Sequence, residues 1–172
     1  TNLITGIVNA AMDSVPMVAL TGQVIRSFMG TDAFQEADIV GLVLPHVKYA
    51  TTVTDSMRLV KEFVNAYYCA HTGRPGPTLL DIPRDVMQED VGDEIDPQIS
   101  PDPEFCRRPG IPPESEFEKA ASLISSASRV TILVGGGVHF SGATGEVLKL
   151  AEIIGAPIVT TMPGKTCIPE DH

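Results

Sequence analysis

Apolar and polar residues alternate along the first half of the chain in two kinds of pattern. Over residues 3–13 and 56–71, apolar side chains recur every three or four positions, which is the spacing of a helix with one buried face. Short apolar stretches bounded by Gly or Pro instead predict strands at 16–22 and 77–83, and a further strand is expected at 47–53. Strands that alternate with helices at these lengths are typical of β–α–β units. The pattern therefore predicts an α/β fold, with parallel sheets flanked by helices.

Residues 23–37 show neither pattern. They mix Gly, Ser, Thr, Asp and Gln with two aromatic residues, Phe28 and Phe34. This composition predicts an irregular segment held by a few apolar side chains, and loops of this kind often line functional sites.

The second half of the chain repeats the α/β rhythm after a segment of different composition. Residues 83–113 contain seven prolines, and residues 85–104 contain eight acids and no base. This predicts an extended linker on the surface. A disordered spacer fits the composition nearly as well, and only four apolar residues favour docking: Val86, Ile95, Ile99 and Phe105. Beyond the linker we expect a helix at 114–128, a strand at 129–134, a glycine turn at 135–138, a helix at 143–154 and a strand at 157–161.

Charge and composition exclude several classes of protein. The chain has 172 residues, 12 basic and 22 acidic, so its net charge is −10. Proteins that bind nucleic acid usually carry clustered basic residues, so we expect no nucleic-acid partner. No apolar stretch approaches the roughly 18 to 20 residues of a membrane span, and the opening residues lack a signal-peptide pattern. We expect no membrane contact and a location in the cytoplasm or an organelle matrix. The three cysteines form no disulfide framework.

Two motifs have candidate chemistry. The glycines of Val134–Val138 follow a predicted strand and precede a helix, an arrangement that brings backbone N–H groups close to a phosphate. Phe140 breaks the strict GxGxxG spacing, so a nucleotide cofactor is only slightly favoured over a tight turn. In the sequence GRPGP, Arg74 could hold a phosphate or carboxylate, but from the residues alone a helix stop whose arginine covers the last carbonyls is favoured.

Other polar residues point to no particular chemistry. Asp32, Glu36 and Asp38 could form a carboxylate cluster, but a solvated loop face is the favoured interpretation. The four histidines are too scattered for metal-ligand spacing. From the residues alone, the sequence supports only a cofactor-binding α/β protein with unknown chemistry.

Five blocks of the sequence resemble, in the same order, the large catalytic subunit of acetolactate synthase (acetohydroxyacid synthase), a thiamine-diphosphate-dependent enzyme. The resemblance runs through nearly the whole chain, and its longest blocks are GTDAFQE and GRPGP. The blocks are residues 1–6, 21–24, 30–36, 73–77 with 81–85, and 134–138.

The resemblance implies a position in a larger subunit. Residues 1–84 correspond to the C-terminal half of the pyrimidine-binding domain, 85–113 to an interdomain linker and 114–172 to the N-terminal half of a central domain. It also implies thiamine diphosphate, Mg²⁺ and FAD as cofactors and 2-oxoacids as substrates. The family decarboxylates pyruvate and joins the hydroxyethyl unit to a second 2-oxoacid, in branched-chain amino acid synthesis. A homodimer or homotetramer is implied, with a regulatory subunit as a further partner.

The resemblance also assigns residue roles. Phe34 and Gln35 correspond to residues near the second substrate, and Arg84 stands where many members carry a lysine at the channel mouth. Family contacts to FAD, which is structural rather than redox-active there, correspond to Arg74, Gly135, Gly136, Gly137, Thr161 and Met162. The chain contributes no metal ligand in this comparison.

Some departures from the family keep alternatives open. The glutamate that activates thiamine lies upstream of Thr1 in the family, and the GDG-containing metal motif is absent, so we expect the isolated chain to be inactive. The sequence from Met162 to Thr166 also differs from the run common near FAD. This difference keeps open other carboligases or decarboxylases, of the glyoxylate carboligase or sulfoacetaldehyde acetyltransferase type. A non-catalytic nucleotide-binding remnant is the third alternative.

Overall fold

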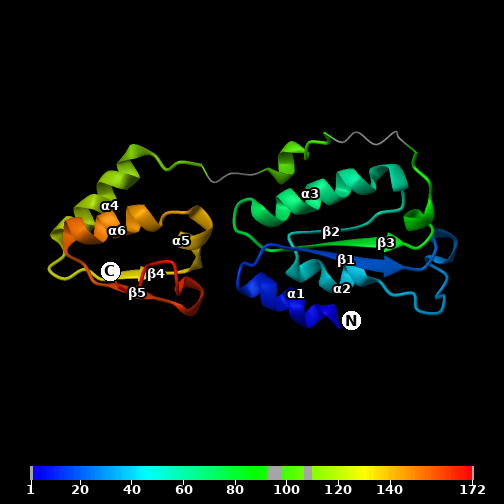
Figure 1. The fold of residues 1–172 in the computed structure, drawn as a ribbon, viewed down its shortest axis with the longest axis horizontal. Coiled ribbons are helices and arrows are strands. Elements are labelled where there is room, and N and C mark those ends of the chain that lie inside the picture. Colours follow the sequence, from blue (N-terminus) through cyan, green and yellow to red (C-terminus); the bar gives the residue numbers. More distant parts are fainter. Residues whose placement is uncertain (1, 93–97, 107–109, 172) are drawn as a thin grey trace. The chain divides into compact units, whose positions relative to one another are not determined.

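A computed structural model describes residues 2–92, 98–106 and 110–171. The chain divides into two compact units, Thr1–Pro109 and Gly110–His172, which we call the first and the second unit. Both units consist of parallel strands flanked by helices (Figure 1). The predicted α/β class is therefore confirmed.

The first unit is built around β3 (Pro77–Pro83). This strand lies between β1 (Met17–Gln23) and β2 (Tyr49–Thr52) in a three-stranded parallel sheet. All seven residues of β3 are buried, as is usual for the central strand of a parallel sheet, although Thr78 and Asp81 are polar.

Helices cover both faces of this sheet (Figure 1). On one face, Ile7 of α1 (Leu3–Met12) and Val43 of α2 (Ile39–Val43) form a buried cluster with Leu79. On the other face, Ala66 of α3 (Leu59–His71) forms a cluster with Leu80. Successive residues of a strand point to opposite faces, so Leu79 and Leu80 together account for the burial of both sides.

Part of the predicted linker lies along α3. The side-chain amide of Asn65 donates to the Asp102 carboxylate at 2.9 Å, and the Asp102 backbone N–H donates back to Asn65 Oδ1 at 2.9 Å. The Phe105 ring packs edge-on against Tyr49, with ring centroids 4.9 Å apart. These contacts attach residues 102–105 to the first unit, and Val86 is buried in its core. Ile95 lies outside the described residues.

The second unit contains a parallel pair of strands, β4 (Ile132–Val134) and β5 (Ile158–Thr160). Val134 is buried in a cluster with Cys167 and Ile168. The helices of this unit are α4 (Glu114–Ser126), α5 (Gly136–Ser141) and α6 (Thr144–Ile154).

The structure corrects the sequence prediction at three places. The predicted turn at 135–138 is wrong, because α5 begins at Gly136. The pattern also missed α2, which has only five residues, too few to show a period. Finally, α4 forms as predicted, but its expected apolar face is largely exposed, with Phe117 at 51% and Leu123 at 72%.

Short 3₁₀ turns connect the helices and strands. They are found at Arg26–Phe28, Leu44–His46, Ser56–Arg58, Val86–Gln88, Pro103–Phe105 and Met162–Gly164.

Candidate functional site

A hollow of about 310 Å³ lies where β1 and β3 end, and we call it the strand-end pocket. The carboxyl ends of parallel strands are the usual place for a ligand in α/β folds, because the loops that leave them are not needed for the sheet itself. The pocket is lined by Gly22, Gln23, Val24, Ile25, Phe28, Gln35 and Arg84.

Two of the three predicted substrate-proximal residues meet in this pocket. Gln35 comes from the irregular segment after β1, and Arg84 directly follows β3. The Arg84 backbone N–H donates to the carbonyl of Gln23 at 3.1 Å, which joins the two strand ends. Phe34 is not part of the lining, and its side chain is 89% exposed.

The loop that carries Gln35 is held by Glu36. Its carboxylate accepts hydrogen bonds from the backbone N–H of Gly30 and, at 3.0 Å, from that of Ala33. The hydrogen bond from Gly30 is the main reason that the pKa of Glu36 lies below its ordinary value. Gln35 itself has a φ of 67°, a left-handed conformation that is uncommon outside glycine. Glu36 is thus a structural residue of the loop, and its hydrogen bonds are local, as the solvated-loop interpretation expects.

Asp81 of β3 binds the side chain of Gln23, a lining residue of the pocket, and was not singled out by the sequence. It is 1% exposed and accepts hydrogen bonds from the Thr21 hydroxyl at 2.7 Å and the Gln23 amide at 2.9 Å. The Gln23 amide also donates to the carbonyl of Ala37 at 2.8 Å. A carboxylate inside a mostly apolar strand is costly to bury without such partners. An Asp within a predicted buried strand is therefore the sequence feature that could have identified this residue.

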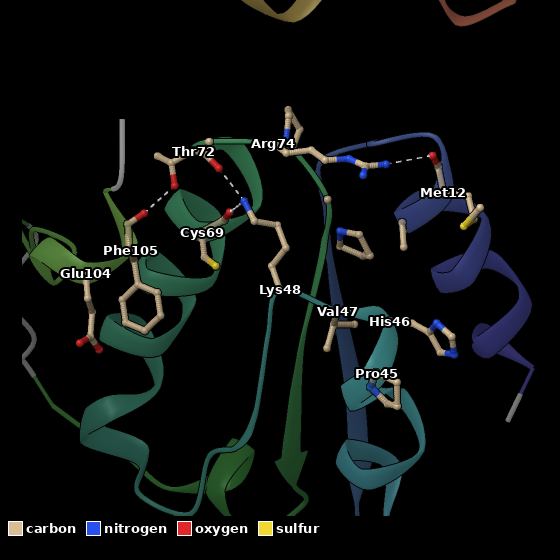
Figure 2. Close-up of a pocket in the computed structure, with 15 residues that line it drawn as sticks. Met12, Pro45, His46, Val47, Lys48, Cys69, Thr72, Arg74, Glu104 and Phe105 are labelled. Carbon is tan, nitrogen blue, oxygen red and sulfur yellow. Dashed lines mark hydrogen bonds between the residues drawn. The ribbon is translucent and has the colours of Figure 1, made fainter. Parts of the chain in front are cut away.

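A second hollow, of about 750 Å³, lies at the opposite, amino end of the same sheet. Its lining includes Lys48 and Arg74, and Figure 2 shows both side chains directed at helix ends. Lys48 Nζ donates to the carbonyls of Cys69 and, at 2.6 Å, Thr72. Partial burial lowers the pKa of this lysine.

Arg74 is bound to the end of α1. Its Nε donates to the Ser14 hydroxyl at 2.7 Å, and one terminal nitrogen donates to the carbonyl of Met12 at 3.4 Å (Figure 2). The expectation that Arg74 covers the carbonyls of the helix before it is therefore wrong, because Lys48 covers the end of α3. The sequence could not show this, since Lys48 is distant from that helix end along the chain.

The remaining predicted cofactor residues meet at the carboxyl ends of β4 and β5. Gly135 and Gly136 follow β4, while Thr161 and Met162 follow β5. The Thr161 N–H donates to the carbonyl of Val134 at 2.9 Å, and a Cβ on Gly136 would lie 3.3 Å from Pro163. Met162 is 87% exposed, and at Gly137 a Cβ would meet nothing within 4 Å. Of the three glycines, Gly137 alone has open space where a Cβ would stand, whereas Gly136 packs closely against Pro163.

Neither a metal-ligand cluster nor a membrane-spanning helix occurs in the described residues. Within 2–92, 98–106 and 110–171, no group of three or more His, Cys, Asp or Glu side chains could hold a metal ion. In the same ranges, every helix is too short or too polar to cross a membrane.

Comparison with known proteins matches the two ends of the chain to two different domains of one enzyme family. Residues 1–42 match the N-terminal TPP-binding domain of thiamine pyrophosphate enzymes, and residues 117–172 match the central domain. The whole chain is 44% identical to a probable acetolactate synthase large subunit of Methanocaldococcus jannaschii and covers 29% of it. It is 42% identical to an acetolactate synthase of Arthrospira platensis, of which it covers 30%, and 42% identical to an acetolactate synthase large subunit of Corynebacterium glutamicum, of which it covers 27%.

The chain thus spans less than a third of the length of these curated relatives, while they match all of it. The matched domains occupy both units, and the parallel α/β architecture of each unit agrees with them. The chain belongs to the thiamine pyrophosphate enzymes and is similar over its whole length to acetolactate synthase large subunits.

Proposed function

We propose that this chain is part of a thiamine-diphosphate-dependent acetolactate synthase, which decarboxylates pyruvate and joins the two-carbon unit to a second 2-oxoacid. The observation that carries the proposal is the meeting of Gln35 and Arg84 in the strand-end pocket. A guanidinium binds a carboxylate through two parallel hydrogen bonds, and an amide can donate to the neighbouring carbonyl oxygen. A 2-oxoacid presents both groups.

In this proposal the residues of the chain bind and orient substrate. Arg84 holds the carboxylate of the second 2-oxoacid and Gln35 donates to its carbonyl, whereas Phe34, which lies outside the pocket lining, is given no contact in this scheme. Thiamine diphosphate, when bound, supplies the electron sink for decarboxylation. The chain has no assigned residue for Mg²⁺, and the activating glutamate of the family is not among its residues. We therefore expect no activity from the chain alone.

FAD is the cofactor that we propose for the second unit. Gly135, Gly136 and Gly137 would approach it through their backbone, with Thr161 and Met162 beside them. The open space at Gly137 and the exposure of Met162 support this fit. Arg74 of the first unit is proposed separately as a phosphate contact, because its bonds to Ser14 and Met12 leave one terminal guanidinium nitrogen available.

The test is an assay of the gene product that contains this chain, purified with thiamine diphosphate, Mg²⁺ and FAD. We expect the protein to make acetolactate from pyruvate alone. We also expect flavin absorption to elute together with the protein in gel filtration. Matched assays with glyoxylate and sulfoacetaldehyde test the alternative carboligases. These alternatives are kept because the sequence at Met162–Pro163 differs from the family sequence near FAD. A preference for either of those substrates would overturn the proposal.

The proposal extends to assembly and location. We expect a homodimer or homotetramer, to which a regulatory subunit could bind, in the cytoplasm or an organelle matrix. Sedimentation of the same purified protein measures its oligomeric state. A protein that stays monomeric while making acetolactate would contradict the expected assembly.

A further inference from the structure

The side chain of Arg26 joins the loops that follow all three strands of the first unit. Arg26 lies in the 3₁₀ turn after β1. Its Nε donates to Asp85 Oδ2 at 2.7 Å, and Asp85 lies in the loop after β3. One terminal nitrogen donates to the carbonyl of Thr54, after β2, at 3.1 Å, and the other pairs with Glu89. A rigid guanidinium with five N–H donors is suited to such a three-way contact.

Two of these loops, those after β1 and β3, also line the strand-end pocket. Ile25 and Phe28, on either side of Arg26, are lining residues, and Arg84 directly precedes Asp85. The backbone N–H of Arg26 adds a further hydrogen bond to Asp85 Oδ1 at 3.1 Å. Both carboxylate oxygens of Asp85 are thus bound by Arg26.

The contact also has an electrostatic consequence for Arg84. A carboxylate next in sequence to Arg84 could pair with it and compete with an anionic ligand. Asp85 is instead paired with Arg26, and among the described residues Arg84 makes no ion pair. The guanidinium of Arg84 therefore stays available to a carboxylate.

We propose that Arg26 is a positioning residue for the strand-end pocket, where it holds the Asp85 loop so that Arg84 can bind the carboxylate of a 2-oxoacid. This inference rests on the proposed function of Arg84. Arg26 itself touches no substrate in this scheme. The Arg26 side chain is more than one-third exposed to solvent, so its ion pairs contribute little to the stability of the fold. Substitution of Arg26 should therefore alter the pocket without unfolding the protein.

The experiment compares Arg26→Ala and Arg26→Lys in the complete gene product, loaded with thiamine diphosphate, Mg²⁺ and FAD. For Arg26→Ala we expect the KM for pyruvate to rise about tenfold, while kcat changes less than about twofold, because misplacement of Arg84 weakens binding. Lysine can hold only one of the loops, so Arg26→Lys should recover part of the loss. Lys61→Ala, which removes another exposed ion pair of the first unit, is the matched control and should leave KM unchanged.

Hydrogen exchange on the same proteins provides a readout that does not depend on activity. Arg26→Ala should speed exchange in the loops after β2 and β3, at residues 53–56 and 84–89, and leave α3 unchanged. Three outcomes would overturn the positioning role of Arg26. They are unchanged hydrogen exchange, faster exchange with an unchanged KM, and a fall in kcat alone. A parent protein that makes no acetolactate overturns the proposed function, and the exchange result then decides whether Arg26 holds these loops.

Discussion

Asp81 illustrates how one buried charge can join two strands. Thr21 and Gln23 of β1 both donate to it, and it is almost completely buried. Asp81→Ala would leave both donors without their charged acceptor. We expect the free energy of unfolding to fall by about 3 kcal/mol, measured by urea denaturation. Asp13→Ala at the exposed end of α1 is the control, and equal urea midpoints for the two variants would contradict this role.

Glu36 gives the loop at Gln35 a defined pH dependence. Hydrogen bonds from Gly30 and Ala33 lower its pKa in the folded state below the ordinary value of 4.5. The ionised carboxylate therefore stabilises the loop at pH values above 4.5, and this contribution is lost as the pH falls through the lowered pKa. We expect the amides of Gly30 and Ala33 to be protected from hydrogen exchange near neutral pH and to lose that protection in acid.

The matched variant for this loop is Glu36→Gln, which stays neutral at every pH. Its amide oxygen is a weaker acceptor, so protection of Gly30 and Ala33 should be lower at neutral pH and free of the acid transition. An acid transition that persists in Glu36→Gln would show that another group controls the loop.

At the scale of elements, the second unit depends on a close approach of two backbone segments. A Cβ on Gly164 would lie 2.3 Å from the carbonyl oxygen of Val134, at the end of β4. Gly164→Ala must therefore displace the strand end or the 3₁₀ turn at Met162–Gly164. We expect it to lower the stability of the second unit by about 1–3 kcal/mol, as overpacking does, measured by its thermal melting.

Gly145 offers the opposite case within the same unit. It lies in α6, and a Cβ there would meet nothing within 4 Å. Gly145→Ala should raise stability by about 0.5–1 kcal/mol, because alanine restricts the unfolded chain and favours the helix. If both alanine variants melted at the same temperature, the close approach at Gly164 would not be a constraint.

At the scale of the whole molecule, the exposed apolar surface of the second unit predicts self-association of the isolated chain. Leu133 and Val159 are register partners on β4 and β5 and are 69% and 51% exposed. Adjacent exposed apolar side chains of this kind promote association. We expect the sedimentation coefficient of the isolated chain to rise with concentration, and the Leu133→Thr/Val159→Thr variant to reduce this effect. A chain that sediments as a monomer at all concentrations would contradict the prediction.

The sequence by itself determined the kind of each longer element and the parallel α/β class. The largely apolar run of β3 indicated a buried strand, because a strand covered by helices on both faces carries apolar side chains on both. Helical periodicity likewise identified α1, α3, α4 and α6. The resemblance carried by GTDAFQE and GRPGP pointed to the family that the comparisons support. These signals are local, so they can be read along the chain.

Only the tertiary structure decided which of these segments meet. Gln35 and Arg84 share a pocket, and Arg26 pairs with Asp85 although 59 residues separate them in sequence. Nor could periodicity show that Lys48 rather than Arg74 covers the end of α3, or that the glycines after β4 begin a helix. Hydrogen bonds between distant loops form once the sheet has brought the strand ends together. The partners of a side chain at these ends are therefore set by the fold and leave no periodic trace in the sequence.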